Sequence, residues 1–105
     1  MLQIKDDVLS MIKGDSANLA IELSDYEYSE GDTLTLTVKK SLDEEEIVFS
    51  HTVPANEAIG IFPEDTNNVK AGRYFYDVQL DMVNGNRITV INPSFIVFME
   101  GVTND

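Results

Sequence analysis

The stretch Thr33-Leu34-Thr35-Leu36-Thr37-Val38-Lys39 decides the fold, because its side chains alternate strictly between apolar and polar. Successive side chains of an extended chain point to opposite faces, so the two leucines and the valine share one face. The β-branched threonines between them suit the solvated face of a sheet. Residues 33–39 are therefore predicted to form a half-buried antiparallel strand.

Upstream of this strand the same alternation recurs. Residues 18–24 place Leu19, Ile21 and Leu23 on one face and are predicted as a second antiparallel strand. Residues 8–13 are short and stop at a Lys-Gly-Asp turn, which favours an edge strand over a helix. Residues 1–6 are predicted to be loose.

Downstream, an acidic connection at 41–46 leads into residues 47–53, which are predicted as a strand ended by Pro54. A short extended piece at 59–62 follows. Residues 63–69 are predicted as a single helical turn, because Pro63 stands at its start and acids lie close to its N-terminus.

Residues 73–83 form the longest predicted strand. On its predicted apolar face lie Tyr74, Tyr76, Val78, Leu80 and Met82, and on its polar face Asp77, Gln79 and Asp81. Residues 84–86, Asn-Gly-Asn, tolerate positive φ and predict a hairpin that returns along 87–91.

The Asn92-Pro93 pair predicts a bulge or an edge position, because proline has no N–H to donate, before pairing resumes at 94–99. Residues 101–105 are predicted to be loose. The whole pattern gives about seven antiparallel strands with regular turn signals, as in an immunoglobulin-like β-sandwich, in one domain spanning 1–105. In such folds a tyrosine hydroxyl bonds back to the backbone just upstream, and Tyr74 is the candidate for this corner.

Charge and composition exclude several classes of partner and site. The chain has 19 acids against 7 bases, a formal net charge of -12, so neither nucleic acid nor an anionic membrane is an expected partner. It has no cysteine, which excludes disulfides and thiolate metal sites. The acidic N-terminal segment lacks signal-peptide character, so the chain is expected to be cytoplasmic when made.

The sequence carries no recognisable catalytic motif, and we expect no enzyme activity, cofactor or metal. His51, the single histidine, shares strand parity with Phe49 and Val53 and is predicted as a structural residue at the rim of the core. The acids group in turns, but their spacing departs from the Asp-x-Asp-x-Asp-Gly pattern of calcium loops, and charge runs at strand ends are usually solvated.

Binding remains as the expected mode of action. Tyr26 and Tyr28, with Glu30 and Asp32 beside them, are candidate contacts for a partner protein or a glycan, and Phe75 is a further aromatic that could stack on a sugar. Exposed strand edges offer a second mode, since a neighbouring subunit can cover their unpaired backbone groups. The negative charge would keep free subunits soluble until a partner of complementary charge docks.

A family resemblance favours assembly through exposed strand edges. It is carried by residues 11–17, 28–40, 61–66, 72–80 and 84–93, which together resemble small prophage-encoded proteins of Firmicutes. The Lys-Gly-Asp opening at 13–15 is similar to that of the N-terminal domain of phage baseplate upper proteins. The resemblance implies a β-sandwich used for assembly, partnered by other tail or baseplate proteins or by itself, and incorporation in the virion.

Two alternatives stay open from the sequence. One is a carbohydrate-binding module for host surface glycans, which rests on the loop tyrosines and acids at 26–32. The other is an inhibitor or host-takeover protein whose acidic surface imitates nucleic acid, which rests on the net charge of -12 alone.

Overall fold

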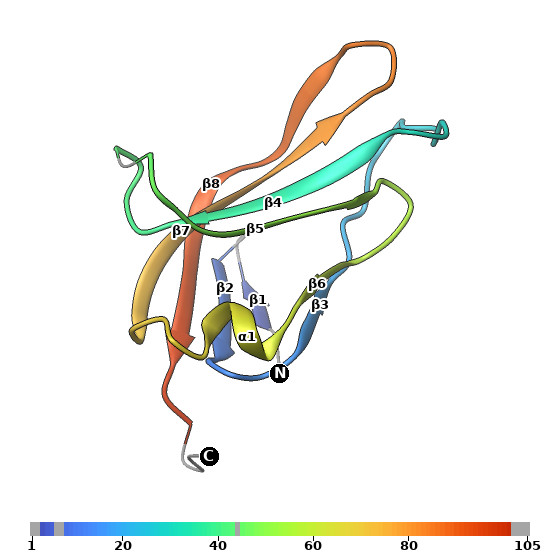
Figure 1. Cartoon of the computed structure of the whole chain (residues 1–105). Helices are drawn as coiled ribbons and strands as arrows, with labels where there is room; N and C mark the ends of the chain where they lie inside the picture. Colours follow the sequence, from blue (N-terminus) through green and yellow to red (C-terminus); the bar gives the residue numbers. More distant parts are fainter. Residues whose placement is uncertain (1–2, 6–7, 44, 102–105) are drawn as a thin grey trace.

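The computed structural model describes residues 3–5, 8–43 and 45–101, which form a mostly-β chain with two sheets and one short helical turn (Figure 1). The larger sheet has the strand order β1-β2-β8-β7-β4-β5, and the smaller one pairs β3 with β6. The elements are β1 (Gln3–Lys5), β2 (Val8–Ile12), β3 (Ala17–Leu19), β4 (Thr33–Lys39), β5 (Ile47–Pro54), β6 (Ile59–Ile61), α1 (Pro63–Thr66), β7 (Gly72–Asp81) and β8 (Arg87–Met99).

Strand β4 occupies the predicted range and pairs antiparallel with β5 on one side and β7 on the other. Its three apolar side chains, Leu34, Leu36 and Val38, are completely buried, while the threonines between them are half-buried. Burying one such aliphatic side chain stabilises a fold by about 1.5–3 kcal/mol, so this face of β4 anchors the core.

Both sheets contribute to a single hydrophobic core. Leu19 from β3 and Ile59 and Ile61 from β6 are fully buried in the same cluster as the inner faces of β4 and β7. The alternation predicted for β7 is confirmed, because Tyr74, Tyr76, Val78 and Leu80 are buried.

The predicted hairpin is also confirmed. The Met82 N–H donates to the Asn86 carbonyl (2.8 Å), the Gly85 N–H donates to the Met82 carbonyl (2.9 Å), and Gly85 has φ +96°. The longest strand is β8, with 13 residues, and not β7, with 10. Asn92 and Pro93 shift the β7–β8 register as predicted, but the strand continues through them.

The prediction that residues 8–13 form an edge strand is wrong in position. Strand β2 lies inside the sheet, with β1 on one side and β8 on the other. It runs parallel to β8, with Leu9 opposite Ile96 and Ile12 opposite Met99, although every strand was predicted to be antiparallel. Alternation fixes which face of a strand is buried and leaves its direction open.

The ends of three predicted segments differ from expectation. Residues 1–6 are predicted to be loose, but Gln3–Lys5 forms β1 and pairs with β2. The other residues of that segment, and residues 102–105 of the predicted loose C-terminus, lie outside the described residues. The strand predicted at 18–24 is paired only over Ala17–Leu19, although Ile21 and Leu23 stay half-buried beyond it. Helix α1 ends at Thr66, before the predicted limit at 69.

Helix α1 is fixed at both ends by side chains. The Asp65 carboxylate accepts the Phe62 N–H (2.7 Å), and the fully buried Thr66 hydroxyl accepts the Gly14 N–H (2.7 Å). The second bond ties the Lys-Gly-Asp turn to α1. No helix in the described ranges has the length and apolar composition needed to cross a membrane.

Candidate functional site

The predicted contact loop is organised around a buried carboxylate. Asp32, one of the predicted contact residues, is only 2% exposed, so little of its side chain is accessible to a partner. Its Oδ2 accepts the Tyr26 hydroxyl (2.5 Å) and the Ser29 N–H (3.2 Å), and its Oδ1 accepts the Val83 N–H (2.9 Å). The carboxylate therefore joins the loop to the end of β7.

These contacts shift the pKa values of both Asp32 and Tyr26. The hydrogen bond from Tyr26, followed by those from the Val83 and Ser29 backbone, holds the pKa of Asp32 below its ordinary value. Burial, followed by the bond to Asp32, raises the pKa of Tyr26 to about 12. A hydroxyl held in this way is less free to reach a glycan, so Tyr26 is largely a structural residue.

Tyr28 and Glu30 remain as exposed members of the predicted contact set, and 38% of the Tyr28 surface is open. Gly31 between them and Asp32 has φ +99°, and a Cβ there would lie 2.4 Å from Val83 Cγ1. The loop therefore packs against the β7–β8 hairpin at Gly31, where a larger residue would collide with Val83.

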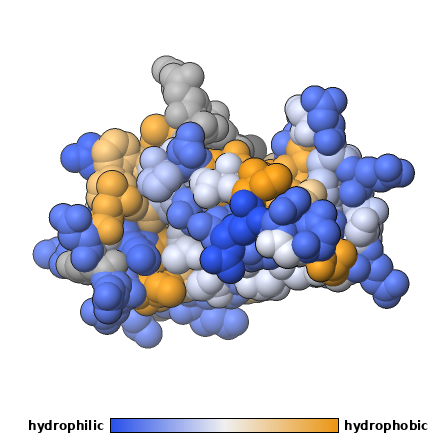
Figure 2. Space-filling view, turned by 90° about the horizontal axis from the view of Figure 1, so that it is seen from above, coloured by the Kyte–Doolittle hydropathy of each residue, from blue (hydrophilic) through white to orange (hydrophobic). Residues whose placement is uncertain are grey.

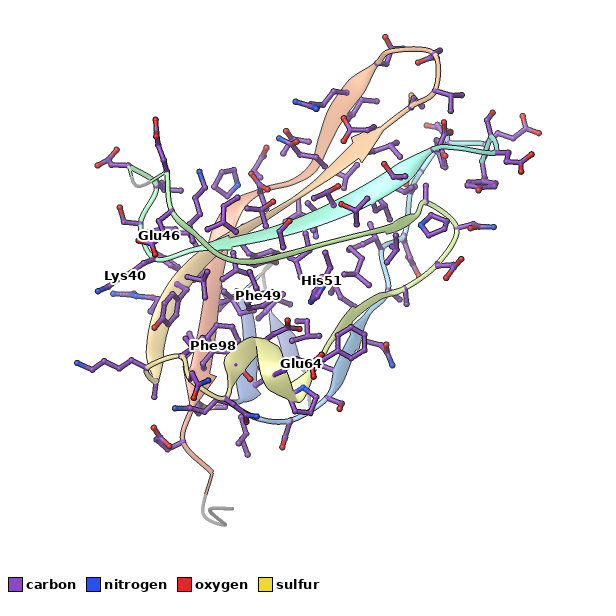
Figure 3. The ribbon with its side chains drawn as sticks, in the orientation of Figure 1. Lys40, Glu46, Phe49, His51, Glu64 and Phe98 are labelled. Atoms are coloured by element: carbon purple, nitrogen blue, oxygen red, sulfur yellow. The ribbon has the colours of Figure 1, made fainter. Side chains whose placement is uncertain are left out.

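His51 has a partner that the sequence did not reveal. Its Nε2 lies 2.7 Å from Asp65 Oδ2, and its ring meets that of Phe62 edge-on at 5.5 Å. The Phe49 ring is also close, with its centroid 5.7 Å from that of His51, and Figure 3 shows His51 reaching from β5 toward α1. Since Asp65 also accepts the Phe62 N–H, the cluster fastens α1 to strand β5.

Tyr74 makes the hydrogen bond expected of a tyrosine corner. Its hydroxyl donates to the Lys70 carbonyl at 2.7 Å, and its ring packs on Phe98 with centroids 5.4 Å apart. The bond closes the chain just before β7.

The outer face of the large sheet carries an aromatic pair beside a small hollow. Phe75 and Phe95 have ring centroids 5.1 Å apart, and the Arg73 guanidinium lies 4.6 Å from the Phe95 centroid. The adjacent hollow, of about 190 Å³, is lined by residues that include Phe75, Asp77 and Lys39. Burial raises the pKa of Asp77, and the charge of Lys39 opposes that effect.

The feature that best fits an interaction site is the free edge of β8. Strand β7 follows one side of β8, but on the other side β2 pairs only with residues 96–99. Within the described chain, no strand pairs with residues 87–95 on that side. Figure 1 shows the β7–β8 hairpin reaching well past the start of β2.

A hollow of about 300 Å³ opens beside this edge. Its lining includes Leu19, Ala20, Ile21, Glu22, Val90 and Ile91. This volume lies at the lower end of the range for ligand pockets. An unpaired backbone edge next to a hollow lined mainly by aliphatic residues is an arrangement that can recognise an added strand, because the backbone supplies hydrogen bonds and the hollow takes side chains.

The other long edge, β5, is more obstructed. It begins after the acidic connection, ends at Pro54 and carries a register shift opposite Val38 and Lys39. The His51–Asp65 contact also brings α1 against it. Charged flanks, terminal proline and bulges are the features by which proteins protect sheet edges.

The surface lacks one dominant apolar area on the side seen in Figure 2, where apolar residues form separate patches among hydrophilic ones. In the described ranges, no group of three or more His, Asp or Glu side chains is placed to hold a metal ion. Comparison of the chain with protein-family models, curated proteins and solved structures gives no match.

Proposed function

We propose that the chain is a non-enzymatic structural protein of a phage or prophage particle, associated with the tail or baseplate, that works by protein–protein interaction. The observation that carries this proposal is the free edge of β8 at residues 87–95 beside the hollow. A strand edge left open by the fold is a surface on which another subunit can complete the sheet.

Two further features support the assembly role. Residues 11–17 and 28–40 resemble small prophage-encoded proteins of Firmicutes, and the Lys-Gly-Asp opening at 13–15 is similar to that of the N-terminal domain of phage baseplate upper proteins. The two sheets share one core and Tyr74 makes a corner bond, which is consistent with a variant of the immunoglobulin-like β-sandwich that has one parallel strand pair.

Native mass spectrometry tests the proposal. The protein is measured alone and after co-expression with the proteins encoded on either side of its gene. We expect a complex of fixed stoichiometry with at least one of them. A chain that stays monomeric with every neighbour and is absent from purified particles would refute the proposal, and formation of oligomers of this chain alone would assign the edge to self-association.

Carbohydrate binding is a second candidate, favoured by the exposed ring of Tyr28 and by the exposed Glu30 two positions along the chain. An aromatic face flanked by a carboxylate is suited to stack on a sugar and accept its hydroxyl protons. A glycan array should then give signals that Tyr28→Ala abolishes and Tyr28→Phe retains. A blank array with the unmodified protein removes this candidate.

A further inference from the structure

We propose that the free edge of β8 receives an extended, positively charged segment of a partner protein, which adds as a strand beside Arg87–Ile91, beyond the start of β2. This inference rests on the proposed function and specifies both the edge that is used and the chemistry of the partner.

The register shows which backbone groups are available. Met82 and Asn86 are joined by a backbone bond, and bonded and non-bonded pairs alternate along an antiparallel ladder. Ile88 is therefore in a pair bonded to β7, whereas Arg87 and Thr89 direct their N–H and C=O groups to the open side. These two residues present a set of donors and acceptors that an added strand can satisfy.

The hollow supplies the side-chain contacts. Three aliphatic residues of its lining are half-buried: Ile21, Val90 and Ile91. The exposed part of each side chain is available to contact a partner. Alternate side chains of an added strand point to one face, which places every second one over this hollow. The segment is therefore expected to carry apolar residues at alternate positions.

The acidic segment 14–38 favours basic residues at the positions of the added strand that do not face the hollow. From 14 to 38 the chain contains no Lys or Arg, and its acids are Asp15, Glu22, Asp25, Glu27, Glu30 and Asp32. Glu22 lies in the lining of the hollow, and every charged residue from 14 to 38 is acidic. The cationic Arg87 on the open edge is already paired with Asp81 (2.6 Å). A second copy of this chain, with the same charge of -12, would be repelled, whereas a cationic strand would be attracted.

The test uses two capped peptides of about eight residues, within the usual length of strands, that alternate valine with lysine or valine with glutamate. Amide chemical shifts of the isotope-labelled protein report binding. The lysine peptide should perturb the amides of 87–91 and of 20–22, and it should bind more tightly at low salt than at high salt. Equal binding of the glutamate peptide, or perturbation centred on β5, would overturn the proposal.

Backbone variants test the edge itself. Thr89→Pro removes one outward N–H, and we expect the affinity for the lysine peptide to fall about fivefold or more. Thr89→Val keeps the N–H and a β-branched side chain, so it should bind like the unmodified protein. Undiminished binding by Thr89→Pro refutes the inference. Ala20→Arg, a substitution of an exposed residue at the hollow, gives the same test if Thr89→Pro fails to fold.

The charge variants form a matched pair. Glu22→Lys and Glu46→Lys change the net charge equally, but Glu46 lies beside β5 at the far end of the sheet (Figure 3). We expect about a twofold to fivefold loss with Glu22→Lys and a smaller one with Glu46→Lys. Equal losses would contradict a local electrostatic contact.

The same Thr89→Pro variant separates the two proposals. If it still forms the complex found with the neighbouring gene products, the assembly function stands and the assignment of the β8 edge as the binding site is wrong. If the unmodified chain forms no complex with them and is absent from particles, the assembly function itself fails.

Discussion

Replacing Tyr74 by phenylalanine deletes one oxygen and leaves the ring in place. The ring keeps its packing on Phe98 at 5.4 Å, and no apolar volume is lost, so the change isolates the hydrogen bond to the Lys70 carbonyl (2.7 Å). A typical intramolecular hydrogen bond contributes about 0.5–1.5 kcal/mol, and an acceptor left unsatisfied when buried costs about 1–3 kcal/mol.

The expected loss lies toward the lower end of these ranges. Lys70 is an exposed residue and its hydrogen bond with Tyr74 is only partly buried, so the vacated carbonyl is not fully removed from water. We expect Tyr74→Phe to lower the free energy of unfolding by about 1 kcal/mol and the Tm by about 4–8 °C. Urea unfolding followed by circular dichroism measures the first quantity, and a thermal scan measures the second.

Tyr28→Phe serves as the control, because it removes the same atom from an exposed ring. Such surface changes usually stay within about 0.5 kcal/mol. If the two variants cannot be distinguished, the hydrogen bond between Tyr74 and the Lys70 carbonyl does not stabilise the fold. A loss of several kcal/mol would instead show that the ring itself is displaced.

Four further predictions follow from the core and from the contact loop. Leu36→Ala should cost about 2–5 kcal/mol in urea unfolding because the side chain is fully buried in a central strand; a loss under about 1 kcal/mol would contradict that position. Gly31→Ala should destabilise more than Gly85→Ala in the same assay, since both have positive φ but only Gly31 lacks room for a Cβ, and equal losses would refute the close contact. The pKa of Asp32 is lowered on folding, so its stabilising effect is complete above the ordinary value of 3.8 and is lost as pH falls through the folded pKa. Asp32→Asn should therefore weaken the fold at neutral pH and flatten the acid side of its stability profile; an unchanged profile would rule this out. Tyr26 with a pKa of about 12 should ionise, in an ultraviolet titration, well above its ordinary 10.0, and Asp32→Asn should lower that value.

Local patterns were sufficient where neighbours in sequence are neighbours in the sheet. The alternation of Leu34, Leu36 and Val38 predicted both the strand and its buried face. The Asn-Gly-Asn turn at 84–86 predicted the hairpin, because positive φ at Gly85 is a local requirement. In both cases the deciding contacts lie within a few residues.

Contacts between distant residues were not accessible in this way. Asp32 has the composition of a solvated turn acid, and its burial depends on the Val83 N–H, which lies 51 positions away. His51 and Asp65 are 14 positions apart, and no spacing rule joins them. The parallel pairing of β2 with β8 leaves no mark on either strand, since alternation is the same in both directions.

That parallel pairing also determines how the protein would respond to mechanical force. If the start of β2 and the end of β8 are pulled in opposite directions, the load runs along the strands and strains the hydrogen bonds between them together. Such a shear geometry resists extension better than a hairpin, which peels open one bond at a time. A chain anchored by these two strands would hold its shape under tension until the whole pair slipped at once.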